Sequence, residues 1–238
     1  MSLRGLSVLV LLLVIPARPQ QTLDKFSPKK LSASKNPHIS KYANVLSAAV
    51  WKDTKVINVC WENLSPKFKE ERAIVKQAVD DTWHHYSALD FLGWEECVPS
   101  NHGVRIETED SGPVTKGLGR QLDGVQNGMV LNLTFQNWRP LGQVDKRRWI
   151  YDTAVHEFGH AIGLAHEQNR FDVPGECSQL DMQSGDNGDK CTGKQCLTPY
   201  DPHSVMNYCN SIWNNDGRLS DLDKQAIQEL YGVRQQPS

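Results

Sequence analysis

The sequence predicts an α+β or mixed α/β fold from three observations. Residues 55–61 alternate in the manner of a β-strand and are enriched in valine and isoleucine. Apolar residues at helical spacing follow Ser65 and recur before Gly232, and a third helical stretch carries a histidine-rich motif. The expected order is therefore a strand, a helix, three strands, a helix, a cysteine-containing irregular region and a terminal helix.

The first 50 residues are not expected to belong to the folded domain. Arg4 precedes an apolar run at 6–15 that is too short to span a bilayer, and we assign 1–20 to a signal peptide. Residues 21–50 are rich in Lys, Ser, Pro and Asn and predict a linker or short pro-segment. The remainder, 51–238, fits one globular domain of a secreted, extracellular protein.

Partners are limited by the charge of the chain. The formal net charge of −2 shows no strong sign, so neither nucleic acid nor a membrane is expected as a partner. We expect a monomer.

The first predicted helix covers about 66–89. Ser65 is its N-cap and Pro66 its first residue, and one apolar face is formed by Phe68, Val75, Val79, Trp83 and Tyr86. Three short strands are predicted after it at 92–98, 104–107 and 129–135. The stretch 111–128 contains five glycines and is expected to be a loop.

The second helix is predicted at about 149–164, followed by an irregular region at 167–203. The last helix begins at Ser220, which forms a capping box with Asp223, and ends at Gly232. All six cysteines follow the signal peptide, and an even number in an exported chain favours three disulfides. We expect Cys60 to pair with Cys97 and the other four cysteines to link the C-terminal part.

Residues 156–166, HEFGHAIGLAH, carry the strongest chemical signal. His156 and His160 are four apart and lie on one helical face, with Glu157 beside them. A left-handed backbone at Gly163 would end the helix and bring His166 back to the same point. Three imidazoles and one open position are typical of a catalytic zinc site, in which bound water has a pKa of about 7. Glu157 is then the expected general base. We expect one catalytic zinc ion.

The motif resembles the zinc signature of the metzincin metallopeptidases, and Ser204-Val-Met-Asn-Tyr208 resembles their Met-turn. The extended string HEFGHAIGLAHEQNR at 156–170 is most similar to the astacin family. The resemblance implies Met206 as the floor of the site, Tyr208 as a fifth zinc ligand that stabilises the transition state, and Glu167 as a buried structural carboxylate.

A metzincin fold would have a twisted mixed sheet and two long helices in an N-terminal lobe, to about residue 163. The C-terminal lobe, 164–238, would be small and mostly irregular, with a terminal helix. The implied function is a secreted zinc metalloendopeptidase acting on proteins or peptides. Residues 128–134 are our candidate for the antiparallel sheet edge that holds an extended substrate.

Three alternatives stay open. The fold could bind a protein partner without cutting it, although such a relic would often lose Glu157. The zinc could be structural, although no fourth obligatory ligand accompanies the three histidines. An acidic stretch could bind calcium through carboxylate oxygens, but its spacing fits no EF-hand and a solvated loop is favoured. Its polar residues are Asp181, Asp186, Asn187 and Asp189.

Overall fold

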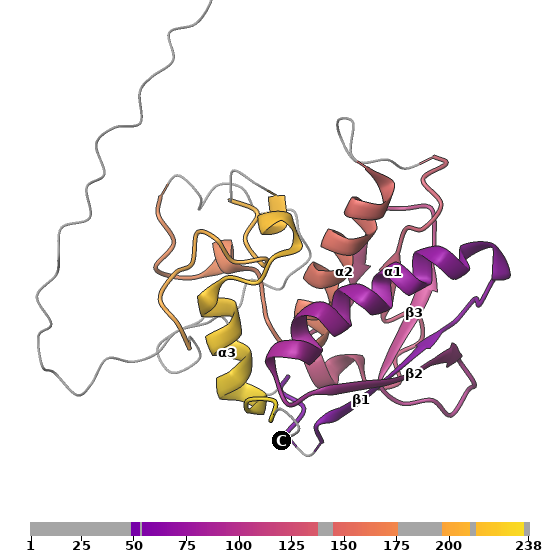
Figure 1. Cartoon of the computed structure of the whole chain (residues 1–238), viewed down its shortest axis with the longest axis horizontal. Helices are drawn as coiled ribbons and strands as arrows, with labels where there is room; N and C mark the ends of the chain where they lie inside the picture. Colours follow the sequence, from indigo (N-terminus) through magenta and orange to yellow (C-terminus); the bar gives the residue numbers. More distant parts are fainter. Residues whose placement is uncertain (1–48, 53, 138–144, 176–196, 210–212, 236–238) are drawn as a thin grey trace, which may run out of the picture. The chain divides into compact units, whose positions relative to one another are not determined.

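The computed structural model describes residues 49–52, 54–137, 145–175, 197–209 and 213–235 (Figure 1). The chain divides into two units, Met1–His38 and Ile39–Ser238, and every described residue lies in the second. The predicted signal peptide, most of the predicted linker and the acidic candidate for calcium lie outside the described residues.

The strands are β1 (Val56–Trp61), β2 (Asp90–Glu96), β3 (Val104–Thr108), β4 (Val114–Thr115) and β5 (Met129–Leu131). The helices are α1 (Lys69–Val79), α2 (Lys146–Ala161) and α3 (Asp221–Tyr231). Shorter helical turns are η1 (Pro66–Phe68), η2 (Asp80–His84), η3 (Gly119–Leu122), η4 (Glu167–Asn169) and η6 (Trp213–Gly217).

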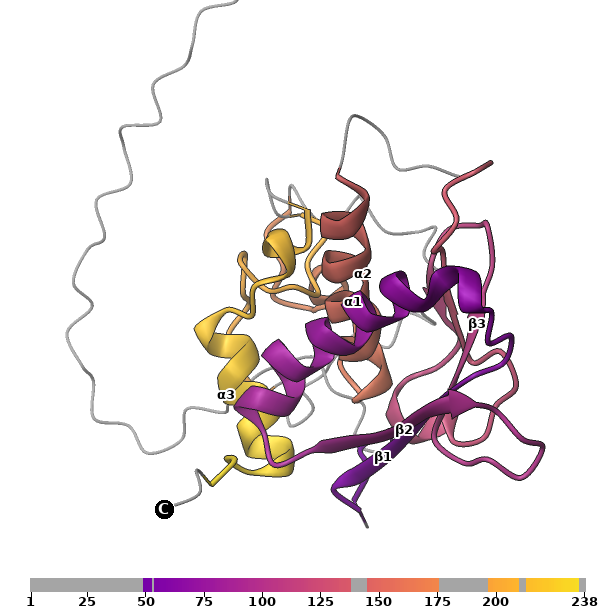
Figure 2. The same cartoon turned by 45° about the vertical axis from the view of Figure 1, so that its right-hand side comes forward.

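The sheet is mixed. Its strand order is β2-β1-β3-β5-β4, with four parallel strands and β4 antiparallel to β5. Ile57 and Val59 of β1 are buried while Val56 and Asn58 are exposed, which is typical of a sheet covered on one face. α1 and α2 lie side by side against the sheet (Figures 1 and 2). The predicted α+β class with a mixed sheet and two helices beside it is confirmed.

The first predicted helix is present and is assembled from three pieces. Ser65 caps its start and Pro66 occupies the first position, as predicted. η1 leads into α1, and a π-helical turn, η2, continues it. The middle of the predicted apolar face is fully buried and packs in the core; its residues are Val75, Val79 and Trp83.

A bulge in β2 brings an aromatic side chain onto α2. The register against β1 shifts between Val59 and Cys60, so that Trp94 is the extra residue. Gly93 precedes it with φ of +93°, and a Cβ there would lie 2.7 Å from Val59 O. The Trp94 ring then stacks on Phe158, with centroids 5.7 Å apart.

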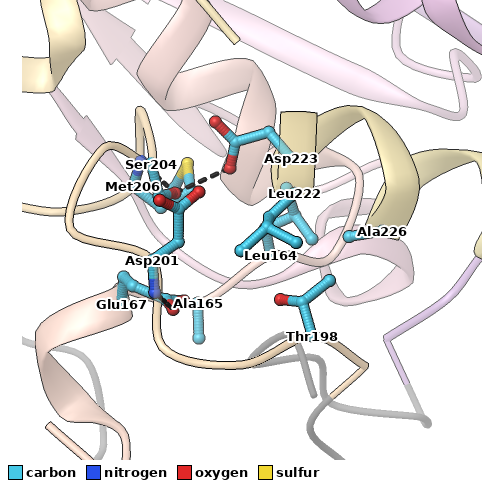
Figure 3. Close-up of a pocket in the computed structure, with 10 residues that line it drawn as sticks. All are labelled: Leu164, Ala165, Glu167, Thr198, Asp201, Ser204, Met206, Leu222, Asp223 and Ala226. Carbon is cyan, nitrogen blue, oxygen red and sulfur yellow. Dashed lines mark hydrogen bonds between the residues drawn. The ribbon is translucent and has the colours of Figure 1, made fainter. Parts of the chain in front are cut away.

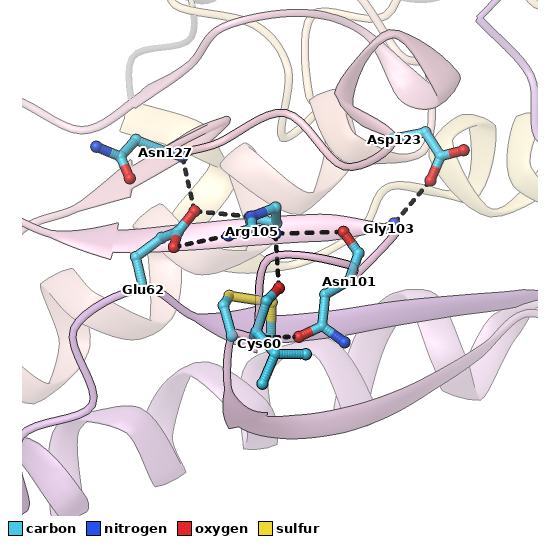
Figure 4. Close-up of a disulfide and its surroundings, with 9 residues drawn as sticks. Cys60, Glu62, Asn101, Gly103, Arg105, Asp123 and Asn127 are labelled. Atoms are coloured by element: carbon cyan, nitrogen blue, oxygen red, sulfur yellow. Dashed lines mark hydrogen bonds and ion pairs between the residues drawn. A yellow bond between two sulfur atoms is a disulfide. The ribbon is translucent and has the colours of Figure 1, made fainter.

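The disulfide between Cys60 and Cys97 confirms the predicted pairing (Figure 4). It joins β1 to the chain just after β2. Beside it, Arg105 donates to both carboxylate oxygens of Glu62, at 2.8 and 3.0 Å, and to Val98 O at 3.0 Å. This buried ion pair and the disulfide fix the same end of the sheet. Cys209 is also disulfide-bonded, and the remaining cysteines lie outside the described residues.

The predicted loop at 111–128 contains two elements that the sequence did not reveal. β4 is a two-residue strand, and η3 is a short helical turn. The third predicted strand, 129–135, is shorter than expected, because the ladder of β5 ends at Leu131. A pattern of alternation cannot be recognised over two or three residues, which explains both errors.

The first described residues, 49–51, form a strap across the end of α2. Ala49 O accepts a hydrogen bond from Arg120 N at 2.7 Å, and Trp51 Nε1 donates to Ala161 O at 2.9 Å. The Tyr231 hydroxyl, at the end of α3, accepts from Trp51 N at 3.3 Å and donates to Ile162 O at 2.7 Å. The strap and α3 therefore meet at the turn that follows α2.

α3 begins and ends as predicted. Ser220 and Asp223 form the expected capping box, and Gly232 follows its last residue with φ of +87°. Within the described part of the chain, no helix has the length and apolar character needed to cross a membrane.

Candidate zinc site

The buried helix α2 provides three of the predicted site residues. It runs from Lys146 to Ala161, so it begins and ends three residues earlier than predicted. The Asp145 side chain caps it by accepting from Arg148 N at 2.8 Å. His156, Glu157 and His160 all project from its buried part, with exposed fractions of 1%, 4% and 6%.

The chain turns sharply after α2 at Gly163. The backbone there has φ of +99°, a conformation that favours glycine. Gly163 N donates to His160 O and Leu164 N to Gly159 O, at 2.9 and 3.0 Å. This turn returns the chain along α2 and brings His166 to the other two histidines.

The three imidazoles converge through their Nε2 atoms. His166 Nε2 lies 3.1 Å from the Nε2 atoms of both His156 and His160. The Nδ1 atoms of His156 and His160 each lie 2.8 Å from a backbone carbonyl oxygen, those of Val205 and Leu164. Because a carbonyl only accepts, the Nδ1 atoms of His156 and His160 carry the proton, and the Nε2 atoms of these two rings carry lone pairs.

This arrangement fits a divalent cation. The Nε2 lone pairs of His156 and His160 would both be stabilised by a positive charge shared with His166 Nε2. Two nitrogens bound to one tetrahedral zinc are separated by about 3.3–3.4 Å, close to the observed spacing. Burial and the neighbouring histidines hold the pKa of His156 well below 6.5, which keeps this ring neutral as a metal ligand must be. Among the described residues, these three form the group of His, Cys, Asp or Glu suited to a metal.

Tyr208 lies against the same histidines. Its hydroxyl is 3.2 Å from His156 Nε2, and its ring stacks on the His156 ring with centroids 5.0 Å apart. Its backbone N donates to Gln168 Oε1 at 3.0 Å, a contact that the sequence did not suggest. The structure thus brings the predicted fifth ligand to the edge of the three-histidine group.

Glu157 is buried next to this group. Burial raises the pKa of its carboxyl to about 7, despite opposing effects of a hydrogen bond from Thr115 and of nearby His166. The Thr115 hydroxyl donates to Glu157 Oε2 at 2.6 Å. Thr115 belongs to β4, inside the predicted loop, and an isolated threonine carries no motif by which sequence reasoning could have found it.

Met206, the methionine of the Met-turn resemblance, packs against α2. A Cβ added to Gly159 of α2 would lie only 2.3 Å from Met206 Sδ, so the thioether packs directly on the helix backbone between the two motif histidines. Met206 O accepts from Glu167 N at 2.9 Å, which ties the turn to the residue after His166. The sequence offered Gly159 only as an unspecified position of the motif.

The first turn of α3 holds this Met-turn in place. The buried carboxylate of Asp223 accepts from Ser204 Oγ at 2.7 Å (Figure 3). It also accepts from Val205 N at 3.0 Å. Since Val205 O in turn accepts from His156 Nδ1, α3 is connected to a histidine of the site through a single residue. The predicted capping box therefore has a second, tertiary role.

Glu167 is buried, as the resemblance implied. Its Oε1 accepts from Asp201 N at 2.7 Å and lies 3.3 Å from Arg170 Nε. Burial raises the pKa of this carboxyl to about 8, against the opposing charge of Arg170. Glu167, Asp201, Ser204, Met206 and Asp223 line one small pocket under the site (Figure 3).

The predicted substrate edge is wrong. Residues 128–134 were expected at an antiparallel edge of the sheet, but β5 lies between β3 and β4 and runs parallel to β3. The antiparallel edge strand is β4. The error follows from the unrecognised strand, because without β4 the next strand along the chain takes the edge position.

Comparisons with known proteins point to the same family as the motif. Residues 143–238 match the model of the peptidase family described as Astacin. Zinc metalloproteinase nas-25 of Caenorhabditis elegans is 32% identical over 149 residues, covering 58% of this chain and 33% of that protein. Zinc metalloproteinase nas-20 of the same organism is 31% identical over 122 residues, covering 51% and 28%. The chain spans about a third of the length of these curated relatives.

Two solved structures share the fold. Myroilysin superposes with a TM-score of 0.57 at 22% identity, covering 80% of this chain and 99% of that one. High choriolytic enzyme 1, a hatching enzyme zinc-protease from Oryzias latipes, gives a TM-score of 0.53 at 20% identity, covering 85% and 100%. The predicted resemblance to astacins and the predicted fold are confirmed.

Proposed function

We propose that this chain, an astacin-like metzincin by sequence and fold, is a zinc-dependent endopeptidase that hydrolyses peptide bonds in proteins or peptides. The observation that carries the proposal is the convergence of three buried Nε2 atoms at 3.1 Å beside a buried glutamate. The two curated relatives are both named zinc metalloproteinases.

His156, His160 and His166 would hold one zinc ion, with Tyr208 as an additional ligand. Bound zinc would polarise the substrate carbonyl and lower the pKa of a water molecule to about 7. The backbone carbonyls of Val205 and Leu164 orient two of the rings by accepting their Nδ1 protons. This orientation is set before substrate arrives, so the reaction requires no rearrangement of these two ligands.

Glu157 would serve as general base and then general acid. It accepts a proton from the attacking water and delivers it to the departing amine nitrogen. A pKa raised to about 7 by burial suits both steps, because the carboxyl can take and release a proton near neutral pH. The Tyr208 hydroxyl, which lies 3.2 Å from His156 Nε2, would donate to the oxygen that gains negative charge when the carbonyl is attacked.

The substrate would lie along β4 as an added antiparallel strand. β4 is the edge of the sheet and carries Thr115, whose side chain reaches Glu157. An extended peptide can pair with such an edge through main-chain hydrogen bonds, which position it without fixing its sequence.

We further propose that the protein is secreted as a monomer. The N-terminal pattern of 1–20 supports a signal peptide, 21–50 a linker or short pro-segment, and 51–238 the catalytic domain. The disulfide between Cys60 and Cys97 fits an oxidising compartment. We would place the boundary of the two lobes at the Gly163 turn, and we propose no calcium ion.

The decisive experiment substitutes Glu157→Ala and measures zinc content and casein cleavage. We expect one zinc per chain in both proteins and a rate at least about 10²- to 10⁴-fold lower in the variant, because general base catalysis is lost while the ligands remain. Glu95→Ala, an exposed carboxylate on β2, is the matched control and should cleave like the wild type.

Undiminished casein cleavage by Glu157→Ala would refute the role of Glu157. A wild-type protein that binds zinc and casein but never cleaves would instead favour the protein-binding alternative.

A further inference from the structure

The edge strand β4 makes a side-chain contact with the candidate site that its sequence gave no reason to expect. β4 has two residues, and Thr115, its second, lies 42 positions before Glu157. Thr115 Oγ1 is 2.6 Å from Glu157 Oε2 and 3.4 Å from Glu157 O. Since a hydroxyl has one proton, the shorter contact to the carboxylate is the hydrogen bond.

This hydrogen bond distinguishes the two oxygens of the carboxylate. Oε2 accepts the hydrogen bond from Thr115, so the two oxygens have different surroundings. A glutamate side chain has three rotatable bonds and keeps considerable rotamer freedom unless something fixes it. Burial restricts Glu157, but the Thr115 hydroxyl is the directional contact that selects one orientation of its carboxylate.

The main-chain groups of Thr115 lie in the plane of the sheet and face its open edge. Thr115 lies opposite Met129, and the next residue, Lys116, donates its N–H to Gly128 O at 2.8 Å. In an antiparallel pair, successive residues point their N–H and C=O groups to alternate sides. The N–H and C=O of Thr115 therefore point away from β5, where an added strand would bind.

We propose that Thr115 is a positioning residue that couples substrate binding to the general base. An extended peptide that pairs with the main chain of Thr115 fixes the same residue whose hydroxyl orients the Glu157 carboxylate. The base is therefore held best when substrate occupies the edge. This inference rests on the proposed endopeptidase function and assigns it one further residue.

The test compares Thr115→Val with Thr115→Ser in the full chain. Valine keeps the β-branched shape but removes the hydroxyl, while serine keeps the hydroxyl. Kinetics are measured on a quenched fluorogenic peptide that the wild type cleaves, together with zinc content and thermal unfolding. Thr115→Val should lower kcat about 10- to 100-fold, as expected for the loss of a hydrogen bond to a carboxylate, with KM changed by less than about twofold.

Thr115→Ser should stay within about threefold of the wild-type kcat, because it retains the donor. Thr108→Val, at a half-buried threonine of the interior strand β3, is the matched control and should leave both constants unchanged. The zinc content should be equal in all four proteins, and all four should be fully folded at the assay temperature. A rise in KM alone would also contradict the proposal, because Thr115 would then act only in binding.

Wild-type kcat in Thr115→Val would overturn the assignment. So would an equal loss in Thr115→Ser, or activity that falls only in proportion to lost zinc or folded protein, since the contact would then be structural. If the wild type binds zinc but cleaves no peptide, the proposed function itself fails, and this inference fails with it. The two failures are thus distinguished by the wild-type measurement alone.

Discussion

The two long helices, α1 and α2, lie side by side and are buried in different ways. α1 buries one apolar face, formed by Ile74, Val75, Ala78 and Val79. α2 is buried all round from residue 152 to residue 161, and half of those side chains are polar or ionisable. The polar ones are Asp152, Thr153, His156, Glu157 and His160.

The difference shows that buried residues stabilise the two helices in two distinct ways. In α1, stability comes from apolar area removed from water, which any well-packed side chain supplies. In α2, the buried polar groups need hydrogen-bond partners, and an unmade bond costs about 1–3 kcal/mol. His156 and Glu157 find theirs in distant segments, at Val205 and Thr115. Asp152 is instead bonded by Arg148 within α2 itself. α2 therefore depends on the rest of the molecule far more than α1 does.

Removal of zinc should give the largest difference in stability between α1 and α2. With free zinc about 1000 times above its dissociation constant, chelation should lower the free energy of unfolding by about 4 kcal/mol. Because the ligands lie on α2 and its following turn, hydrogen exchange should accelerate more in α2 peptides than in α1 peptides. Denaturant unfolding and peptide-resolved exchange, with and without 1,10-phenanthroline, measure both. Equal acceleration in the two helices would contradict the comparison.

Val79→Ala should destabilise the fold without weakening zinc binding. Val79 is fully buried in α1, and loss of its two methyl groups should cost roughly 2–3 kcal/mol through lost burial and a residual cavity. Zinc affinity of the folded protein should not change, because α1 supplies no ligand. Denaturant unfolding and competition with a zinc indicator give the two quantities. A weaker zinc affinity would show that α1 shapes the site directly.

The next largest effect should come from exchanges of glycine and alanine. We expect glycine to be the more stabilising residue at position 159 of α2 and alanine at position 78 of α1. Gly159→Ala adds a Cβ 2.3 Å from Met206 Sδ, so overpacking of about 1–3 kcal/mol should exceed the gain of about 1 kcal/mol in helix propensity. In α1 the reverse change, Ala78→Gly, should lose about 1 kcal/mol of propensity. Unfolding free energies of both variants test this. Stabilisation by Gly159→Ala would mean that Met206 moves aside without cost.

The N-caps should give the smallest effect. The Asp145 side chain accepts from Arg148 N at 2.8 Å, whereas the Ser65 side chain accepts from Lys67 N at 3.4 Å. Asp145→Ala should therefore cost about 1 kcal/mol, and Ser65→Ala about 0.5 kcal/mol. Both are read from denaturant midpoints at unchanged slope. A larger loss at Ser65 would reverse the expected order.

Local sequence patterns predicted what depends on local rules. The N-cap Ser65, the apolar face of α1, the capping box of α3 and the left-handed turn at Gly163 all follow from spacing and residue type within a few positions. The convergence of His156, His160 and His166 was also accessible, because one helix and one turn generate it. The Cys60–Cys97 pair was predicted as well and is present.

Contacts between distant segments were not accessible in this way. β4 has too few residues to show any periodicity. Because it was not predicted, the expected substrate edge was assigned to β5. The bond from Val205 N to Asp223, the packing of Met206 on Gly159 and the bond from Thr115 to Glu157 each join segments 18 to 47 positions apart. Only the fold decides which of many similar serines, threonines and glycines become neighbours.

The bonds made by Tyr231 also bear on how the protein is made. Its hydroxyl joins Trp51, 180 positions earlier, to the turn after α2. A ribosome adds about 5–20 residues per second, so roughly 10 to 40 s separate the synthesis of these two partners. Over the last 65 of these positions, between His166 and Tyr231, the nascent chain contains all three histidines but lacks the residue that holds their turn. The metal site is therefore completed late, after the last helix has been translated.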